Sequence, residues 1–267
     1  MSDSRYILLG GEAGYERLRV LARAAASNTS ALFDRVGLHD GMRCCDLGCG
    51  PGVVSLTLAE RVAPSGHVDG IDMDEVKLDL ARRDAAERGV SNVSFRAGDV
   101  TAWADRAAYD VVYARFLLHH LKRPVDMLAR MWAGLRPGGA LVVEDADFSL
   151  AFCEPPLEAF DFFIDAYSET IRRRGGDHAT GRKLYRYAVE AGVEAPVLSM
   201  VQRVDATGEA KTMMHNTLVA TSDAMVAEGV ATPEAIAEAV AALASATADA
   251  GTVIGAPATF QIWARRT

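Results

Sequence analysis

The sequence is organised around residues 44–52, which read Cys44-Cys45-Asp46-Leu47-Gly48-Cys49-Gly50-Pro51-Gly52. The three glycines of this stretch fall at every second position. They let the backbone bend sharply and approach a ligand with no Cβ in the way. The residues before them indicate the end of a buried strand, and a helical pattern begins just after them. A strand, a glycine turn and a helix N-terminus together predict a nucleotide cradle, because exposed amide N–H groups suit an anionic group.

The spacing of the glycines separates two classes of ligand. The dinucleotide fingerprint Gly-x-Gly-x-x-Gly requires its third glycine at position 53, which is Val53 here. The third glycine is instead Gly52. The loop therefore resembles the Asp-x-Gly-x-Gly-x-Gly signature of class I S-adenosylmethionine (SAM)-dependent methyltransferases.

Composition limits the kind of partner. The chain has 267 residues, of which 50% are hydrophobic, so a sizeable core is available. Lys and Arg number 28 and Asp and Glu number 36, which gives 28 − 36 = −8. This acidic balance disfavours binding to a phosphate backbone, so we expect no nucleic-acid partner. It suits an enzyme that acts on a small molecule.

The cysteines and the first residues indicate the compartment. Three of the four cysteines lie in the strand and the glycine loop, and none forms a Cys-x-x-Cys pair. We therefore expect neither a disulfide framework nor a metal site. Residues 1–14 resemble neither a signal peptide nor a membrane span. A cytoplasmic protein without a membrane partner is the expectation.

The segment before the first strand is predicted to be a helical lid over the cradle. One helix fits the apolar spacing from Tyr15, and residues 27–30, Ser-Asn-Thr-Ser, are typical of the N-cap of a second helix. Tyr6 and Arg19 are candidates to contact the amino-acid end of a ligand.

An acidic residue follows the second predicted strand, residues 67–71. Asp72 lies about 20 positions beyond the glycines, where a carboxylate accepts hydrogen bonds from both ribose hydroxyls. Met73 is a candidate contact for the purine face. Asp74 is typical of the N-cap of the next helix, which Gly89 ends.

A second acidic residue follows the third predicted strand, residues 93–96. In the family that the loop resembles, an Asp at this place recognises the adenine amino group, which implies that role for Asp99. The backbone amide of Val100 is then a candidate to face a ring nitrogen. Two carboxylates would thus contact an adenosine from two sides.

The remaining strands predict the fold class. Residues 109–114 and 140–144 indicate buried parallel strands, with a sharp turn at Pro137-Gly138-Gly139. Further strands are predicted at 197–204 and 259–264. Strands that alternate with helices at this length predict an α/β fold with a doubly wound parallel sheet.

After residue 150 the pattern becomes helical. An aromatic face on the first helix there, Phe160, Phe163 and Tyr167, is a candidate cover for a planar ligand. Its end, Arg172-Arg173-Arg174, is interpreted as favourable cations at a helix C-terminus rather than a phosphate site. We predict a single domain, whose parts are a lid (1–40), a SAM-binding core (41–150), cap helices with the sixth strand (151–250) and the last strand (258–267).

Taken together, residues 40–145 resemble class I SAM-dependent methyltransferases, and the N-terminal Tyr-x-Leu-x-Gly-Gly pattern is similar to a bacterial subgroup that acts on small metabolites. The resemblance implies a Rossmann-like, seven-stranded, mostly parallel sheet whose final two strands pair antiparallel. It also implies S-adenosyl-L-methionine as cofactor and S-adenosyl-L-homocysteine as product. The cofactor contacts that we expect are Tyr6, Asp46, Gly48, Cys49, Gly50, Asp72, Met73, Asp99, Val100, Ala114 and Arg115.

A sulfonium methyl group is already electrophilic, so the reaction requires no metal. An in-line displacement needs the nucleophile about 3–3.5 Å from the methyl carbon. A base for the acceptor's proton is expected at His119, directly after the fourth strand, or at His178, in a loop of the cap. Glu144 and Asp147 are further candidates.

We therefore expect a SAM-dependent methyltransferase that acts on a small organic acceptor, aromatic or indole-like, within secondary metabolism. A homodimer is compatible with the sequence. Two alternatives stay open, namely a nicotinamide-dependent oxidoreductase and a non-catalytic SAM-binding regulatory protein.

Overall fold

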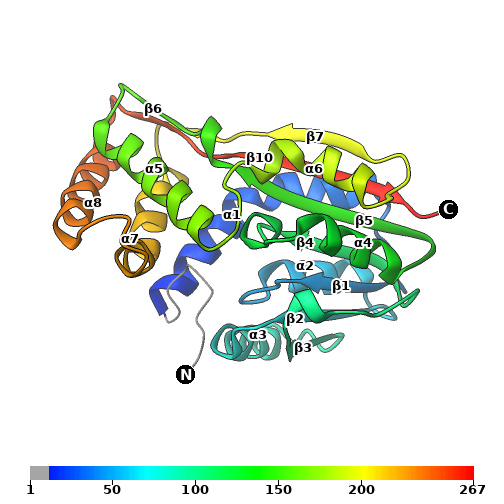
Figure 1. Ribbon diagram of the computed structural model, residues 1–267. Coiled ribbons are helices and arrows are strands. Elements are labelled where there is room, and N and C mark those ends of the chain that lie inside the picture. Colours follow the sequence, from blue (N-terminus) through cyan, green and yellow to red (C-terminus); the bar gives the residue numbers. More distant parts are fainter. Residues whose placement is uncertain (1–11) are drawn as a thin grey trace.

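The computed structural model describes residues 12–267, without the side chains of residues 12–16 and Arg19. The contacts predicted for Tyr6 and for the Arg19 side chain therefore lie outside the described residues. The chain forms a seven-stranded sheet in the order β3-β2-β1-β4-β5-β10-β7 (Figure 1). These strands are β1 (Arg43–Leu47), β2 (His67–Asp72), β3 (Val93–Ala97), β4 (Tyr109–Arg115), β5 (Leu135–Asp147), β7 (Val197–Val201) and β10 (Ala258–Arg265).

The pairing confirms the predicted fold class. Strands β1 to β5 are parallel, and β10 is antiparallel to both of its neighbours, β5 and β7. Parallel strands point their carboxyl ends to one edge, so the loops after β1, β2, β3 and β4 gather there. This edge carries every acidic residue that the sequence nominated for the cofactor.

Helices cover the sheet and its carboxyl edge. Helices α5, α7 and α8 form a cap beyond the end of β5, and α1 reaches from the sheet to that cap (Figure 1). No helix within residues 12–267 combines the length and the apolar character needed to cross a membrane. The helices are α1 (Glu12–Arg35), α2 (Val53–Val62), α3 (Glu75–Glu87), α4 (Pro124–Gly134), α5 (Glu158–Arg173), α6 (Thr180–Glu190), α7 (Met213–Ala227) and α8 (Pro233–Ala248).

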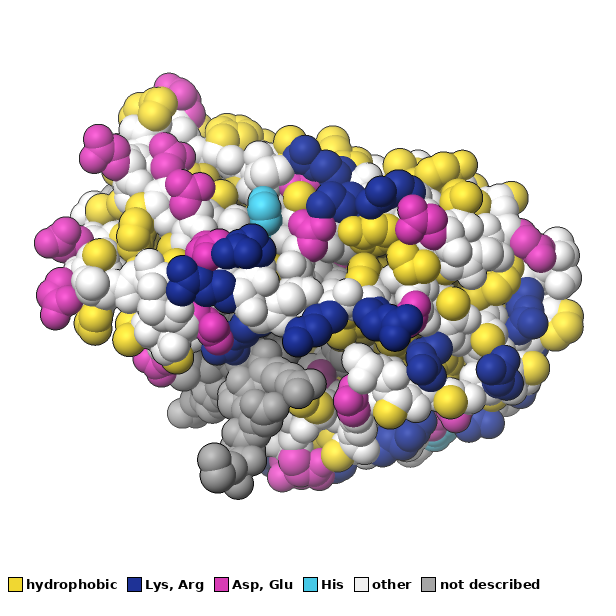
Figure 2. Space-filling view, viewed as in Figure 1, with side chains coloured by type: hydrophobic (Ala, Val, Ile, Leu, Met, Phe, Trp, Pro, Cys, Tyr) yellow, Lys and Arg dark blue, Asp and Glu magenta, His cyan; other side chains and the backbone are white. Residues whose placement is uncertain are grey.

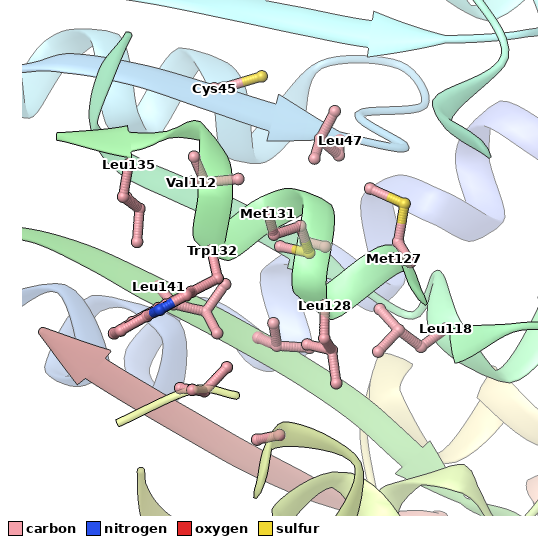
Figure 3. Close-up of a cluster of buried hydrophobic side chains, with 14 of the residues drawn as sticks. Cys45, Leu47, Val112, Leu118, Met127, Leu128, Met131, Trp132, Leu135 and Leu141 are labelled. Atoms are coloured by element: carbon pink, nitrogen blue, oxygen red, sulfur yellow. The ribbon is translucent and has the colours of Figure 1, made fainter. Parts of the chain in front are cut away.

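Alternate residues of the central strands enter two separate cores. Val112 of β4 packs into a cluster with α4 and α6, which Figure 3 shows around Met131 and Trp132. Its neighbour Val111 packs on the other face, against side chains of α1 and α2 such as Phe33. A parallel sheet covered on both faces needs apolar residues at successive positions, which explains the unbroken hydrophobic run of β4.

The helix start predicted at Asp74 is confirmed, and a second helix begins with a side-chain cap of the same kind. Asp74 caps α3, since its Oδ1 accepts from the backbone N–H of Val76 at 3.1 Å and of Lys77 at 3.3 Å. Thr232 caps α8 in the same way, with Pro233 as the first residue of the helix. These local signals hold because each satisfies an amide that the helix itself leaves without an acceptor.

The predicted break between two N-terminal helices is wrong, because α1 is continuous from Glu12 to Arg35. The hydroxyl groups expected to start a second helix serve tertiary contacts instead. Thr29 Oγ1 donates to Glu144 Oε1 of β5 at 2.8 Å, and Ser30 Oγ accepts from Arg61 of α2. Tertiary hydrogen bonds have therefore overridden a local capping pattern.

Two strand predictions also need correction. The assigned strand β5 begins at Leu135 and includes the predicted glycine turn, with an irregular register opposite Tyr109 and Val111. The predicted strand 197–204 ends at Val201, after which the chain enters a separate three-stranded sheet that was not predicted. That sheet comprises β6 (Phe152–Glu154), β8 (Val204–Asp205) and β9 (Val253–Gly255).

Gly52 offers a test of this packing, because a Cβ there would lie 2.7 Å from Ala81 Cβ and 2.8 Å from Phe95 Cζ, at a φ of +76°. Gly52→Ala should lower the free energy of unfolding by roughly 2–4 kcal/mol, through backbone strain plus overpacking. The matched control is Gly89→Ala, with a φ of +67° and no neighbouring atom within 4 Å. It should cost about 1–2 kcal/mol. If urea unfolding showed that both variants lose the same free energy of unfolding, the packing argument would be contradicted.

Candidate active site

The glycine loop between β1 and α2 is held against the end of β2. The amides of Gly48 and Cys49 both donate to the carbonyl oxygen of Ile71, at 2.8 and 3.1 Å. The amide of Gly50 donates to Asp72 Oδ2 at 2.8 Å. The loop is thus positioned by the strand that also carries the predicted ribose ligand.

The three glycines of the loop have different neighbours. The Cβ that a residue at Gly52 would carry points into the protein, against α3 and β3. At Gly50 it would point into open space, where the nearest atom is Leu18 Cδ1 at 4.0 Å. Gly50 has a φ of +53° and lines the cavity described below, so its backbone is open to a ligand.

Asp72 keeps capacity to bind a ligand after its internal hydrogen bonds are counted. Its Oδ2 accepts from Gly50 and its Oδ1 accepts from the amide of Asp74 at 3.0 Å. Each oxygen of an ionised carboxylate has two acceptor positions, so one remains on each. The side chain is 8% exposed and lines the cavity. This geometry fits the pair of ribose hydroxyls.

Asp99 and Val100 lie at the neighbouring loop, after β3. Asp99 Oδ1 accepts from the amide and the hydroxyl of Thr101, at 2.8 and 2.7 Å, and so caps the short helix η1 (Val100–Ala102). Its Oδ2 has no donor among the described residues. A turn-forming Asp and an adenine ligand are therefore compatible functions of one side chain, through different oxygens.

The inner end of the loop is more buried and more polar. Asp46 accepts from Ser55 Oγ at 2.6 Å, and burial raises the pKa of its carboxyl to about 6 despite Ser55 and the nearby Arg115. Burial also raises the pKa of the Cys49 thiol well above its usual range. Cys49 is therefore a neutral thiol in the cavity wall.

Two acids that the sequence offered as bases are occupied by other side chains. Glu144 accepts from Thr29, from the Tyr113 hydroxyl at 2.6 Å and from Gln261 Nε2 at 2.8 Å. Asp147 is fully buried and pairs with Arg182. Both carboxylates are thus satisfied within the protein, and Asp147 does not line the cavity.

His119 lies in the short helix η2 (Leu118–His120) and is held by a buried carboxylate. Its Nδ1 lies 2.6 Å from Asp145 Oδ1, and the amides of Leu118 and His119 donate to Asp145 Oδ2 at 2.7 and 3.2 Å. Because an ionised carboxylate only accepts, Nδ1 carries the proton. In the neutral ring Nε2 is then the acceptor, and it lies 3.4 Å from the hydroxyl of Tyr167.

The glycine loop, Asp72, Asp99 and His119 line one cavity of about 600 Å³, within the size range of small-molecule sites. The part of the cavity beside His119 is aromatic, since Phe148 and Tyr167 stack with their ring centroids 4.2 Å apart. Phe116, Met213 and Met214 add apolar surface. Nine of the predicted cofactor contacts line the cavity, namely Asp46, Gly48, Cys49, Gly50, Asp72, Met73, Asp99, Val100 and Arg115.

The remaining predictions fit less well. Ala114 is buried within the sheet, paired with Leu47 and Val143, and does not line the cavity. His178 does not line it either; its carbonyl oxygen accepts from the amide of Phe148 at 3.0 Å. His178 therefore positions the segment that carries Phe148.

Sequence reasoning missed part of the site. Asp145 carried no signal, because a fully buried acid at the end of a strand looks like any loop residue. Of the predicted aromatic face on α5, Phe160 and Phe163 are core residues, while Tyr167 lines the cavity. Arg17 lines it from α1, and helical spacing alone did not indicate which face of α1 meets the cavity.

One cavity thus brings together a glycine loop, two acids at neighbouring strand ends and a histidine held by a buried carboxylate, which is the arrangement of an enzyme that binds a nucleoside cofactor. A methyltransferase domain model matches residues 38–192, more than half of the chain. The chain therefore belongs to the class I SAM-dependent methyltransferase family. This membership sets aside the nicotinamide alternative.

Individual relatives match over part of their length. The chain is 34% identical over 183 residues to an uncharacterized 37.1 kDa transposon protein of Streptomyces fradiae, covering 68% of this chain and 52% of that protein. It is 34% identical over 113 residues to trans-aconitate 2-methyltransferase of Azoarcus, covering 42% of each. The chain thus spans about half the length of these curated relatives.

The fold has relatives among solved structures. A crystal structure described as a putative methyltransferase from Bacillus halodurans superposes with a TM-score of 0.60 at 20% identity. The match covers 90% of this chain and all of that one, 100%. Similarity at this level of identity shows the fold.

Asp72 should dominate ribose binding. Asp72→Asn replaces one acceptor oxygen by a donor NH₂ group, so S-adenosylhomocysteine should bind at least about tenfold more weakly, since charged hydrogen bonds contribute roughly 1.5–3 kcal/mol each. Asp74→Asn is the control, because Asp74 does not line the cavity and Asn also caps helices. Titration calorimetry measures both. Equal affinity of the Asp72 variant and the wild type would exclude the ribose contact.

Asp46 should make the stability of the ligand-free protein depend on pH. Its folded pKa, about 6, is above the ordinary value of 3.8, so its contribution to stability is complete below pH 3.8 and is lost as the pH rises through 6. Asp46→Asn removes this loss. The melting temperature of the variant relative to wild type should therefore rise between pH 4 and pH 7 and then stay constant. A difference independent of pH would show that Asp46 is not held in its neutral form.

Proposed function

We propose that the protein transfers a methyl group from S-adenosylmethionine to a small organic acceptor with a planar, aromatic or indole-like body. One observation carries this proposal. The glycine loop with Asp72 and His119, which the buried Asp145 holds in place, lie in the walls of the same cavity. A cofactor end and a proton-accepting end are thus close enough to serve one reaction.

The cofactor end fits the nucleoside. Gly50 leaves open space where a side chain would stand, Asp72 keeps two acceptor positions, and Asp99 keeps Oδ2. When bound, S-adenosylmethionine supplies a methyl group that is electrophilic without assistance from a metal. The protein then has to hold, orient and desolvate the acceptor.

The acceptor end favours a flat apolar molecule. The stacked rings of Phe148 and Tyr167 provide an aromatic wall, and aromatic groups pair well with offset or edge-on rings. Met213 and Met214 of α7 face the same cavity, and Met side chains adapt to irregular ligands. These contacts support the aromatic preference over a purely polar substrate.

His119 is the proposed general base. Asp145 holds the proton on Nδ1, so Nε2 is the unprotonated nitrogen. It lies 3.4 Å from the Tyr167 hydroxyl and can take a proton from a hydroxyl or amine of the acceptor that binds there. A positioned base of this kind contributes typically about 10²–10⁴-fold in rate. The resulting imidazolium would be stabilised by the buried Asp145 carboxylate.

His119→Asn should test this role, since Asn can still donate to Asp145 but cannot take the proton. Formation of S-adenosylhomocysteine from S-adenosylmethionine with an active aromatic acceptor should slow about 10²–10⁴-fold in kcat. Affinity for S-adenosylhomocysteine should stay unchanged, because His119 is assigned to the acceptor end. His178→Asn is the control and should retain wild-type kcat.

Two results would contradict the proposal. Wild-type turnover by His119→Asn would remove His119 as the base while leaving methyl transfer intact. Tight binding of S-adenosylmethionine without turnover of any hydroxylated or amino aromatic compound would favour the non-catalytic, regulatory alternative.

A further inference from the structure

The charges around the cavity differ from those of the whole chain. The net charge of the chain is −8, yet seven Lys and Arg residues line the cavity against five Asp and Glu residues. Figure 2 shows Lys and Arg side chains gathered across the middle of the viewed face, over α4, α6 and the end of α5. The cations of the cavity wall are Arg17, Arg115, Lys122, Arg123, Arg130, Arg174 and Arg203.

Three of the five acids lie together at one end of the cavity. Asp46, Asp72 and Glu144 are buried at the sheet edge, where the cofactor is proposed to bind. S-adenosylmethionine carries a net positive charge and only one carboxylate, so the cations beyond the expected contact Arg115 give its binding little advantage. A basic wall attracts an anion instead, and in this enzyme class the second ligand is the acceptor.

Two of the arginines line the same cavity as His119 and His120. Arg17 of α1 is 7% exposed, and its Nη1 donates to Thr217 Oγ1 of α7 at 3.3 Å. Arg174, which caps the end of α5, has a side chain 16% exposed and pairs through Nε with Glu228 Oε1 at 2.9 Å. Arg174 belongs to the Arg172-Arg173-Arg174 triplet, which the sequence analysis interpreted as cations at a helix C-terminus. In the structure Arg174 also lines the cavity.

His120 adds no positive charge of its own. Burial is the main cause that holds its pKa well below the usual range, with His119, Arg17, Lys77 and Arg174 acting in the same direction. Its ring lies 3.8 Å from that of His119, centroid to centroid. The two arginines thus share the cavity wall with a neutral imidazole that lies directly beside the proposed base.

We propose that the acceptor carries a carboxylate group, bound by Arg17 and Arg174 beside His120, while its apolar body lies against Phe148 and Tyr167. This inference rests on the proposed function. The planar fork of a guanidinium matches a carboxylate and can bind it through two parallel hydrogen bonds. A phosphate dianion fits less well, because Arg174 stands at the C-terminus of α5, where the helix dipole is negative.

Matched pairs of probes test the charge directly. The protein is loaded with S-adenosylhomocysteine and titrated in a calorimeter with benzoate and benzamide, cinnamate and cinnamamide, and indole-3-acetate and indole-3-acetamide. Each acid that binds should do so at least tenfold more tightly than its amide. Phenyl phosphate is titrated in the same way and should bind more weakly than the acids.

Substitutions of single arginines test which of them bind the carboxylate. Arg174→Gln and Arg17→Gln should each weaken binding of the best acid at least tenfold and leave binding of its amide and of S-adenosylhomocysteine unchanged. Arg172→Gln is the matched control, since Arg172 belongs to the same triplet and also pairs with a glutamate, but does not line the cavity. If Arg17→Gln melts early, Arg174→Gln decides, because its side chain lies nearer the solvent.

The outcomes separate the two proposals. If the wild type fails to bind S-adenosylhomocysteine, the proposed function itself fails. If S-adenosylhomocysteine binds but no acid does, or the amides bind as tightly as the acids, the carboxylate is overturned alone. The carboxylate proposal would equally be overturned if phenyl phosphate bound more tightly than the acids, or if Arg174→Gln bound the best acid as tightly as the wild type does.

Discussion

The site depends on one buried carboxylate, Asp145. It has no exposed surface, and burial of an ionised group without partners is costly. It accepts hydrogen bonds from the backbone amides of Leu118, His119 and Ala146 and from the ring Nδ1 of His119. These donors come from the turn after β4 and from β5 itself, so a single charge fixes the path of η2, the orientation of the imidazole and the junction of two neighbouring strands.

The same edge of the sheet separates the two ends of the cavity by charge. Carboxylates stand where the strands end, and hold the glycine loop as well as an incoming nucleoside. Most of the cations come from elements that cover this edge, namely α1, α4 with the residues just before it, and the end of α5. The parallel sheet supplies buried acids and a single cation, Arg115, so the elements that cover it add most of the groups of the opposite sign.

Local chemistry explains what the sequence predicted well. The glycine spacing, the position of Asp72 and the cap at Asp74 depend on neighbours within about 25 residues, and all three are found where expected. Asp145 and Arg17 were not found, because their partners lie far along the chain: Arg17 contacts Thr217, 200 residues away. The continuous α1 was missed for the same reason, since Thr29 hydrogen-bonds across to β5 rather than to its own helix.

The place of β10 has a consequence for the order in which the chain can assemble. The strand comes last in the chain, yet it lies between β5 and β7 and pairs with both. During synthesis β7 emerges well before its only partner in the described sheet, and it carries large apolar side chains on its surface, Val197, Leu198 and Met200. Until the final strand is inserted, a growing chain exposes two open strand edges, which are prone to pair with other chains. We therefore expect the protein to depend on a chaperone most strongly while it is still bound to the ribosome, after β7 has emerged and before β10 has paired.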